Sequence, residues 1–128
     1  MTTVILDASA VLAFALDEPG GGIAKDAIDR GALVSAVNHC EVVSKLIDTI
    51  PDETALADAI GFLTYDVMEF GADLAVEAAR LRPATRSKGL SLADRACLAL
   101  ALREGLPVIT TDRQWLGTGL QIDIQLAR

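Results

Sequence analysis

The apolar residues of this chain fall into short continuous runs separated by longer stretches with helical periodicity. Three runs, at residues 4–6, 32–36 and 108–110, predict buried strands. Weaker strand patterns cover residues 65–70 and 121–126, and the second of these alternates polar and apolar positions as an edge strand does. The pattern therefore predicts five short strands spread along the chain.

Between these runs, apolar residues recur at the spacing of helix faces. The expected helices are residues 8–16, 23–30, 38–50, 53–63, 72–82 and 92–103. The last is apolar almost all round its middle, which is typical of a helix at the centre of a molecule. Strands that alternate with such helices favour a parallel sheet covered on both faces. We predict a single domain over residues 1–128 with the fold of a three-layer α/β/α sandwich.

Two of the expected helices have clearly divided faces. In residues 23–30, Ala27 and Ile28 are expected inward, and the outward residues are Lys25, Asp26 and Asp29. In residues 38–50, the inward face is formed by Val42, Val43, Leu46, Ile47 and Ile50. Both patterns are those of helices that cover a core with one side.

The cysteines and the N-terminal segment indicate a cytoplasmic protein. Cys40 and Cys97 are the only cysteines and form no CxxC pair, so we expect buried, reduced thiols. No basic region precedes the first apolar run, and no segment combines the length and apolarity of a membrane span. We therefore expect no membrane partner.

The net charge of −7 argues against a nucleic-acid binder overall, because phosphate contacts need Lys and Arg. The distribution of charge weakens this objection. Asp94 is the one acid within residues 80–95, which hold five basic residues: Arg80, Arg82, Arg86, Lys88 and Arg95. This segment is either a solvated helix end with its loop or a local strip that binds phosphates, and the sequence leaves both open.

Four acidic residues stand near the expected starts of helices: Asp7, Glu41, Asp94 and Asp112. Each has an ordinary explanation. Asp is a preferred N-cap, and the acids of Asn38–Glu41 and Ser91–Asp94 have the spacing of a capping box. Glu41 could also pair with Lys45 one turn further along the helix. Taken singly, each acid is better explained by structure than by catalysis.

Taken together, the four acids predict a metal site. In a parallel sheet, strand ends and the helix starts that follow them share one edge, so the acids are expected to converge there. Carboxylates without a counter-charge repel one another, and Mg²⁺ or Mn²⁺, which prefer oxygen ligands, would remove that repulsion. His39 is the only histidine, which leaves too few ligands for zinc. A carboxylate site for such cations suggests phosphoryl chemistry with an activated water.

The neighbours of the acids are candidates for accessory roles. Ser9 and Thr110 each lie two residues from an acid and would hold waters or phosphate oxygens, or are ordinary strand-end hydroxyls. Arg95 and Arg113 directly follow two of the acids and would contact substrate phosphates or pair with acids. Trp115 is expected in the core rather than as a platform for a base.

These residues also carry a resemblance to a known family. Asp7-Ala-Ser9, Glu41, the segment 90–101 and the segment 110–115 resemble the motifs of PIN domains, and among them the VapC toxins of bacterial VapBC toxin–antitoxin systems. The resemblance spans nearly the whole chain. By it, the family's four acidic positions and two hydroxyl positions match, in this chain, Asp7, Glu41, Asp94, Asp112, Ser9 and Thr110.

The resemblance implies an activity and partners. It implies a small endoribonuclease, dependent on Mg²⁺ or Mn²⁺, that cuts structured RNA and stops translation. It further implies a homodimer that is neutralised by a cognate VapB antitoxin, whose tail occupies the acidic cleft.

Other classes fit the residues less well. A receiver-like signalling domain would share the sheet and the acidic pocket, but the strand-end Lys of that class is missing before Asp112. A zinc deaminase would need a Pro-Cys-x-x-Cys segment after His39-Cys40-Glu41, and none is present. A haloacid-type phosphatase would need an acid where Ser9 stands. A non-enzymatic interaction module is supported only by the 52 % of apolar residues.

Overall fold

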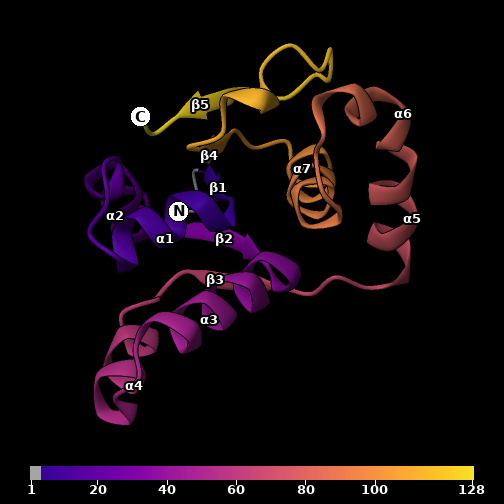
Figure 1. Cartoon of the computed structure of the whole chain (residues 1–128). Coiled ribbons are helices and arrows are strands. Elements are labelled where there is room, and N and C mark those ends of the chain that lie inside the picture. The colour runs from indigo at the N-terminus through magenta and orange to yellow at the C-terminus, as the bar shows by residue number, and fades with distance from the viewer. Residues whose placement is uncertain (1–3) are drawn as a thin grey trace.

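The computed structural model describes residues 4–128, in which five strands form one sheet with the order β3-β2-β1-β4-β5 (Figure 1). All neighbouring strands are parallel. The strands are β1 (Val4–Leu6), β2 (Ala32–Ser35), β3 (Asp66–Met68), β4 (Val108–Thr110) and β5 (Ile124–Leu126). The predicted edge strand near the C-terminus is confirmed, since β5 lies at one end of this order.

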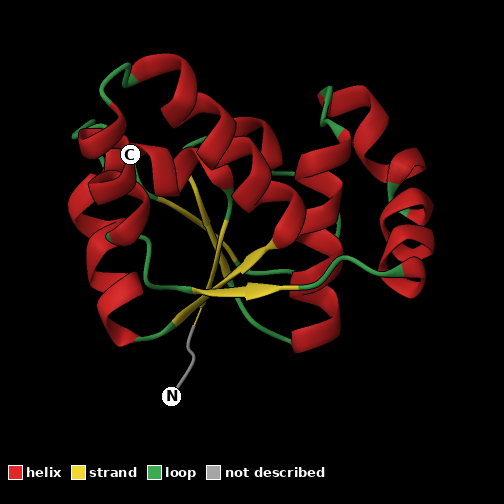
Figure 2. Cartoon of the chain, turned by 90° about the horizontal axis from the view of Figure 1, so that it is seen from below, coloured by secondary structure: helices red, strands yellow, loops and turns green. Residues whose placement is uncertain are grey.

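Helices cover both faces of the sheet, which confirms the predicted three-layer α/β/α sandwich. The helices are α1 (Ala8–Ala15), α2 (Gly21–Arg30), α3 (Ala36–Thr49), α4 (Glu53–Gly61), α5 (Ala72–Arg80), α6 (Arg82–Thr85) and α7 (Leu92–Glu104), with 3₁₀ turns at Arg86–Lys88 and Arg113–Trp115. In Figure 1, α1 and α2 lie on one side of the sheet, and α5, α6 and α7 lie on the other. Figure 2 shows the strands crossing the middle of the molecule between these groups of helices.

The alternation of side chains along each strand builds two separate cores. Val4 and Leu6 of β1 pack in the core formed with α1, α2 and α3, whereas Ile5 between them packs in the core formed with α5 and α7. Leu33 and Val34 of β2 divide in the same way. Buried strands with both faces covered require this continuous apolar sequence, which is why the short runs predict them correctly.

Helix α7 lies at the centre of the second core, as its sequence predicts. Every residue from Ala96 to Ala101 is buried. Trp115 packs in the same core with 1 % of its surface exposed, which confirms that its role is structural. Ser91 caps α7 in a reciprocal capping box with Asp94, so the helix begins where the sequence indicates.

Four predictions about α3 are wrong. The helix begins at Ala36 rather than at Asn38, because the Ser35 hydroxyl accepts the hydrogen bond of the Val37 N–H and acts as the N-cap. The proposed capping box of Asn38 and Glu41 therefore does not exist. Ile47 is 55 % exposed, since the helical hairpin of α3 and α4 extends beyond the sheet (Figure 1). Cys40 is exposed because it lies two residues from both of the buried positions Asn38 and Val42, on another side of the helix.

Pro83 lies just after the end of one helix and in the first turn of the next. Helix α5 stops at Arg80, and Pro83 occupies the first turn of the short helix α6, where its missing N–H costs no hydrogen bond. The other helix boundaries differ from the predicted ones by a few residues at most. Within residues 4–128, no helix is both long and apolar enough to cross a membrane.

Candidate metal and catalytic site

Asp7 lies directly after β1 and is the N-cap of α1, with 4 % of its surface exposed. Its carboxylate accepts three hydrogen bonds. Oδ1 accepts from the Ser9 hydroxyl at 2.6 Å and from the Ala10 N–H at 3.0 Å, and Oδ2 accepts from the Thr110 hydroxyl at 2.8 Å. A carboxylate has about four acceptor positions, so one position on Oδ2 remains for a ligand.

These hydrogen bonds do not fully offset the burial of Asp7. Burial raises the pKa of this carboxyl from 3.8 to about 6, although the three hydrogen bonds lower it, and the charge of Asp94 raises it further. A carboxyl group held in its ionised form at neutral pH without a nearby cation is an unfavourable arrangement. A positive charge beside Asp7 would therefore favour its ionised form.

Ser9 and Thr110 each donate their one hydroxyl proton to the Asp7 carboxylate. The Ser9 oxygen also accepts the Thr111 N–H at 3.0 Å, and the Thr110 oxygen accepts the Asp112 N–H at 3.0 Å. This network joins the end of β1 to the end of β4. The two hydroxyls thus orient the Asp7 carboxylate and fix the turn after β4.

Asp94 and Glu41 add two carboxylates to the same region. Asp94 is half-buried in the first turn of α7, where its Oδ2 accepts the Ser91 N–H at 2.8 Å. Glu41 is exposed in the second turn of α3. Burial raises the pKa of Glu41, the neighbouring Asn38 amide lowers it, and the charge of Asp94 raises it again. Asp94 therefore interacts electrostatically with both Asp7 and Glu41.

The buried thiol of Cys97 lies close to all three of these acids. Burial raises the pKa of Cys97 well above its usual range, and the charges of Asp7, Asp94 and Glu41 each add to that effect. Acids from α3, from α7 and from the end of β1 thus act on one atom. The prediction of a buried thiol is confirmed for Cys97.

Asp112 joins this region differently. Its carboxylate caps the 3₁₀ turn by accepting the Gln114 N–H at 2.9 Å, and its own N–H is bound by Thr110. The Thr110 hydroxyl thus connects the two acids, since it donates to the Asp7 carboxylate and accepts the Asp112 N–H. Asp7, Asp94 and Asp112 each take part in capping a helix or a 3₁₀ turn, as the ordinary explanation has it. The charge of Asp94 nevertheless raises the pKa of both Asp7 and Glu41.

The donor set fits a hard divalent cation better than any other group. Carboxylate and hydroxyl oxygens are the ligands that Mg²⁺ and Mn²⁺ prefer, and Mg²⁺ commonly keeps several waters with one or two carboxylates. Among residues 4–128, no group of three or more Asp, Glu, His or Cys side chains lies close enough together to hold a metal ion. A cation at this site would therefore have few direct protein ligands and keep several waters.

The basic side chains give the site no internal counter-charge. The ion pairs within the described part of the chain are Lys25–Asp29, Asp26–Arg30 and Arg103–Glu104, so none involves the four acids. The pairing of Glu41 with Lys45 is absent there too. Arg95 donates to the Ala78 carbonyl at 3.2 Å and so ties α7 to α5, whereas Arg113 is exposed in its 3₁₀ turn.

Sequence reasoning missed one residue of this region, Asn38. Its side chain is 1 % exposed and donates to the Ala93 carbonyl, next to Asp94. The signal that could have found it is a polar residue one turn before Glu41 on the apolar face of a helix. A surface pocket of about 640 Å³ adjoins this part of α3, lined by Ala36, Val37, Cys40, Glu41, Ser44 and Phe70.

The parallel sheet, with acids near the carboxyl ends of its strands, defines an α/β protein of the class whose ligands commonly bind at that edge of the sheet. The chain belongs to the PIN domain family, whose model matches residues 4–119. No curated protein sequence matches it.

Several solved structures share this fold at low sequence identity. The DNA-bound VapBC of Salmonella typhimurium is 18 % identical, with a TM-score of 0.78 and full coverage of both chains. VapBC2 of Rickettsia felis bound to a promoter DNA fragment is 14 % identical, with a TM-score of 0.75 and coverage of 97 % of this chain and 98 % of that one. The sarcin-ricin loop cleaving toxin VapC20 of Mycobacterium tuberculosis is 17 % identical, with a TM-score of 0.73 and coverage of 92 % and 96 %.

Proposed function

We propose that this PIN domain is a Mg²⁺- or Mn²⁺-dependent endoribonuclease that hydrolyses RNA phosphodiester bonds. The observation that carries the proposal is the buried Asp7 carboxylate, whose pKa is raised to about 6 with the charge of Asp94 beside it and, among the described residues, no cation paired to either. Such a group is costly for the fold alone and useful when a cation binds. Family membership and the VapC20 structure, named as a sarcin-ricin loop cleaving toxin, support the choice of RNA.

In this proposal, the cation is held by Asp7, Glu41, Asp94 and Asp112. When bound, it would lower the pKa of a water and offset the charge that grows on the phosphate. Ser9 and Thr110 keep the Asp7 carboxylate ionised and fixed by donating to both of its oxygens. Asp112 uses Oδ1 to cap its turn, which leaves acceptor positions for the site.

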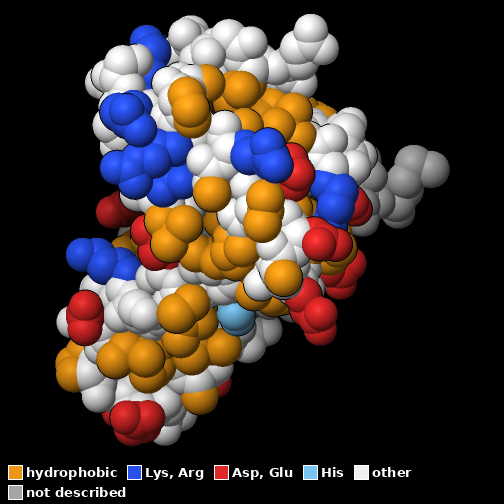
Figure 3. All heavy atoms as spheres, turned by 90° about the vertical axis from the view of Figure 1, so that its right-hand side faces the viewer, with side chains coloured by type: hydrophobic (Ala, Val, Ile, Leu, Met, Phe, Trp, Pro, Cys, Tyr) orange, Lys and Arg blue, Asp and Glu red, His pale blue; other side chains and the backbone are white. Residues whose placement is uncertain are grey.

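The RNA would lie along the basic segment that precedes α7. Arg80, Arg82 and Arg86 are exposed, and within the described residues none of them or Lys88 pairs with a carboxylate. Lys88 lies against Gly117, at the loop that follows Asp112. Figure 3 shows Lys and Arg side chains gathered in the upper part of the face that carries α5 and α6. Unpaired cations beside an acidic site would bind phosphates on either side of the cut.

The proposed physiological role is that of a toxin in a VapBC-type pair, acting in the cytoplasm to inhibit translation. The structural neighbours include the VapBC complexes from Salmonella typhimurium and Rickettsia felis, which supports a VapB-type antitoxin as partner. A homodimer is part of the same proposal. The exposed large apolar side chains, among them Phe62 and Val76, provide surface for such partners.

The proposal is tested by incubating the pure protein with structured RNA and Mn²⁺ and sequencing the ends of the products. We expect cuts at defined positions, which disappear with a chelator and in the Asp94→Asn variant. The matched control is Asp52→Asn, because the Asp52 carboxylate, like that of Asp94, accepts a backbone N–H at the start of a helix, but it does so at α4, away from the site. Cleavage by Asp94→Asn at the wild-type rate would contradict the proposal. Uptake of phosphate from a small phosphodonor, with RNA left intact, would favour a receiver-like domain instead.

A further inference from the structure

Asn38 is a polar side chain at a position that suits an apolar one. It is 1 % exposed, its Nδ2 donates to the Ala93 carbonyl at 3.1 Å, and its Oδ1 is buried with no hydrogen-bond partner among the described residues. An unsatisfied buried amide oxygen costs a fold more than one neutral hydrogen bond returns. An apolar residue of the same size would therefore serve stability as well or better, so the amide needs another explanation.

The position of Asn38 supplies that explanation. Glu41 follows it by one turn on the same side of α3, and Asp94 directly follows Ala93 in α7. The Asn38 side chain thus connects the helix that carries one acid to the helix that carries the other. Within residues 4–128, this is the one hydrogen bond between α3 and α7.

The rest of the contact between these helices does not fix their relative position. Val42 and Leu46 of α3 are fully buried in the first core, whereas Cys97 of α7 is fully buried in the second. Apolar contacts are not directional, whereas a hydrogen bond sets one register. The carboxylates of Glu41 and Asp94 repel each other, so a directional restraint is needed to keep them close.

We infer that Asn38 is a positioning residue, which holds the Glu41 and Asp94 carboxylates at the separation needed to bind one divalent cation together. This inference rests on the proposed function for the cation, and not on the identity of the RNA. The amide also favours the ionised form of Glu41. The fold thus accepts an unsatisfied oxygen to obtain a site that is ordered before the cation arrives.

The test compares three variants by two measurements, the stability of the metal-free protein and the affinity for Mn²⁺ by calorimetry. Asn38→Leu keeps the branched shape and the number of side-chain heavy atoms and removes the unsatisfied oxygen, so its metal-free melting temperature should equal or exceed that of the wild type. Asn38→Ala leaves a cavity and should melt lower. Because both lose the restraint, we expect both to bind Mn²⁺ at least about tenfold more weakly.

Val42→Ala is the matched control. It weakens the packing of α3, since Val42 is completely buried in the core that α3 shares with α1 and α2, but it leaves the Asn38 hydrogen bond in place. We expect it to melt lower and to bind Mn²⁺ within about threefold of the wild type, at a temperature where all variants are folded.

Two results would overturn the inference. One is wild-type Mn²⁺ affinity in both Asn38 variants. The other is a loss of affinity that follows the loss of stability across all three variants. In both cases the wild type still binds Mn²⁺ and the proposed function stands. A wild-type protein that binds no Mn²⁺ would instead overturn the proposed function, and this inference with it.

Discussion

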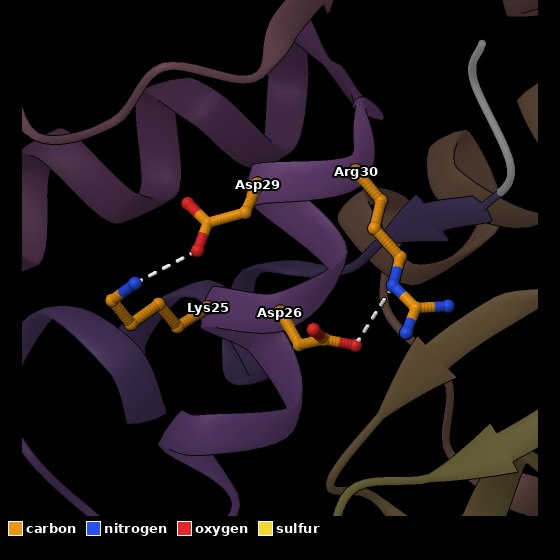
Figure 4. A network of polar contacts seen from close by, with 4 residues as sticks. All are labelled: Lys25, Asp26, Asp29 and Arg30. Atoms are coloured by element: carbon orange, nitrogen blue, oxygen red, sulfur yellow. Dashed lines mark hydrogen bonds and ion pairs between the residues drawn. The ribbon is translucent and has the colours of Figure 1, made fainter.

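Among the described residues, the acids on the outer face of α2 are paired with cations, whereas the acids at the sheet edge are not. On the outer face of α2, each acid has its own cation one turn away: Lys25 lies 2.8 Å from Asp29, and Arg30 lies 3.1 Å from Asp26 (Figure 4). At the sheet edge, Asp7 and Asp94 have hydrogen-bond donors but, within the described residues, no cation. The α2 acids are exposed and each has a cation, whereas the sheet-edge acids are partly buried and have no cation among the described residues.

In the proposed function, the α2 charges serve the helix and the sheet-edge charges serve a bound cation. Pairs at i and i+4 in solvent contribute little, because water and salt screen them, and their removal leaves no stranded charge. The carboxyl group of Asp7 has a raised pKa because it lost its water without gaining a cation. The sheet edge thus carries an unfavourable charge arrangement that a divalent cation from solution would correct.

The largest effect that separates the two regions is expected in RNA cleavage. Asp7→Asn and Asp94→Asn should each lower the cleavage rate in Mn²⁺ by more than about a hundredfold, since even residues that only orient metal ligands cost up to that much. Asp26→Asn on α2 should cleave at the wild-type rate. Rates on one structured RNA measure the effect, and equal losses in all three variants would remove the distinction.

The next largest effect is the pH dependence of metal-free stability. The pKa of Asp7 is about 6 in the folded protein and 3.8 ordinarily, so the folded state holds this proton more tightly. The contribution of Asp7 to stability is therefore present below about pH 4 and is lost as the pH rises to about 6, by about 3 kcal/mol. Asp7→Asn should remove this decline and be the more stable protein at pH 7. Urea unfolding at several pH values measures it, and identical pH profiles for the two proteins would show that Asp7 is not the group responsible.

A slightly smaller effect is expected from adding and removing metal. Mn²⁺ at 100 times its dissociation constant should stabilise the wild type by about 2.7 kcal/mol, and a chelator should reverse this. Asp94→Asn should gain much less, while Asp52→Asn should gain as much as the wild type. Thermal melts with and without Mn²⁺ measure it. A full gain in Asp94→Asn would place the cation elsewhere.

The smallest effect is expected on α2 itself. Asp26→Asn removes the partner of Arg30 in a pair whose side chains are 63 % and 69 % exposed. We expect the melting temperature to change by less than about 2 °C, with no change in the response to Mn²⁺. A larger shift would mean that the α2 pairs matter to the fold, and the contrast between the two regions would weaken.

The features that could be predicted from the sequence are those that depend on residues close together in the chain. The outward face of α2, the strand at 108–110 and the Ser91 cap depend on local spacing, and all three are confirmed. The predicted start of α3 is wrong because Ser35 and Asn38 are both good caps, and only the extent of β2 decides between them. Ile47 is exposed because α3 extends beyond the sheet, which no local pattern records. Cys40 is exposed because Asn38 and Val42 define the buried face of α3, and Cys40 lies on another side of the helix.

The candidate site likewise contains residues that the local sequence indicates and contacts that only the fold creates. The acids are recognisable by residue type and by position at expected helix starts. The donation of Thr110 to Asp7 spans 103 residues, and that of Asn38 to Ala93 spans 55, so neither partner could be named before the fold was known. Asp112 stands at its predicted place, but its carboxylate turns to cap its own 3₁₀ turn, which depends on local hydrogen bonding and not on charge.

A crystal structure of the protein soaked in Mn²⁺, with the metal located by its anomalous signal, tests the central claim most directly. We expect one strong peak in contact with Oδ2 of Asp7 and with a carboxylate oxygen of Asp94. A peak at Asp26 or Asp29 of α2, with none at the end of β1, would contradict it.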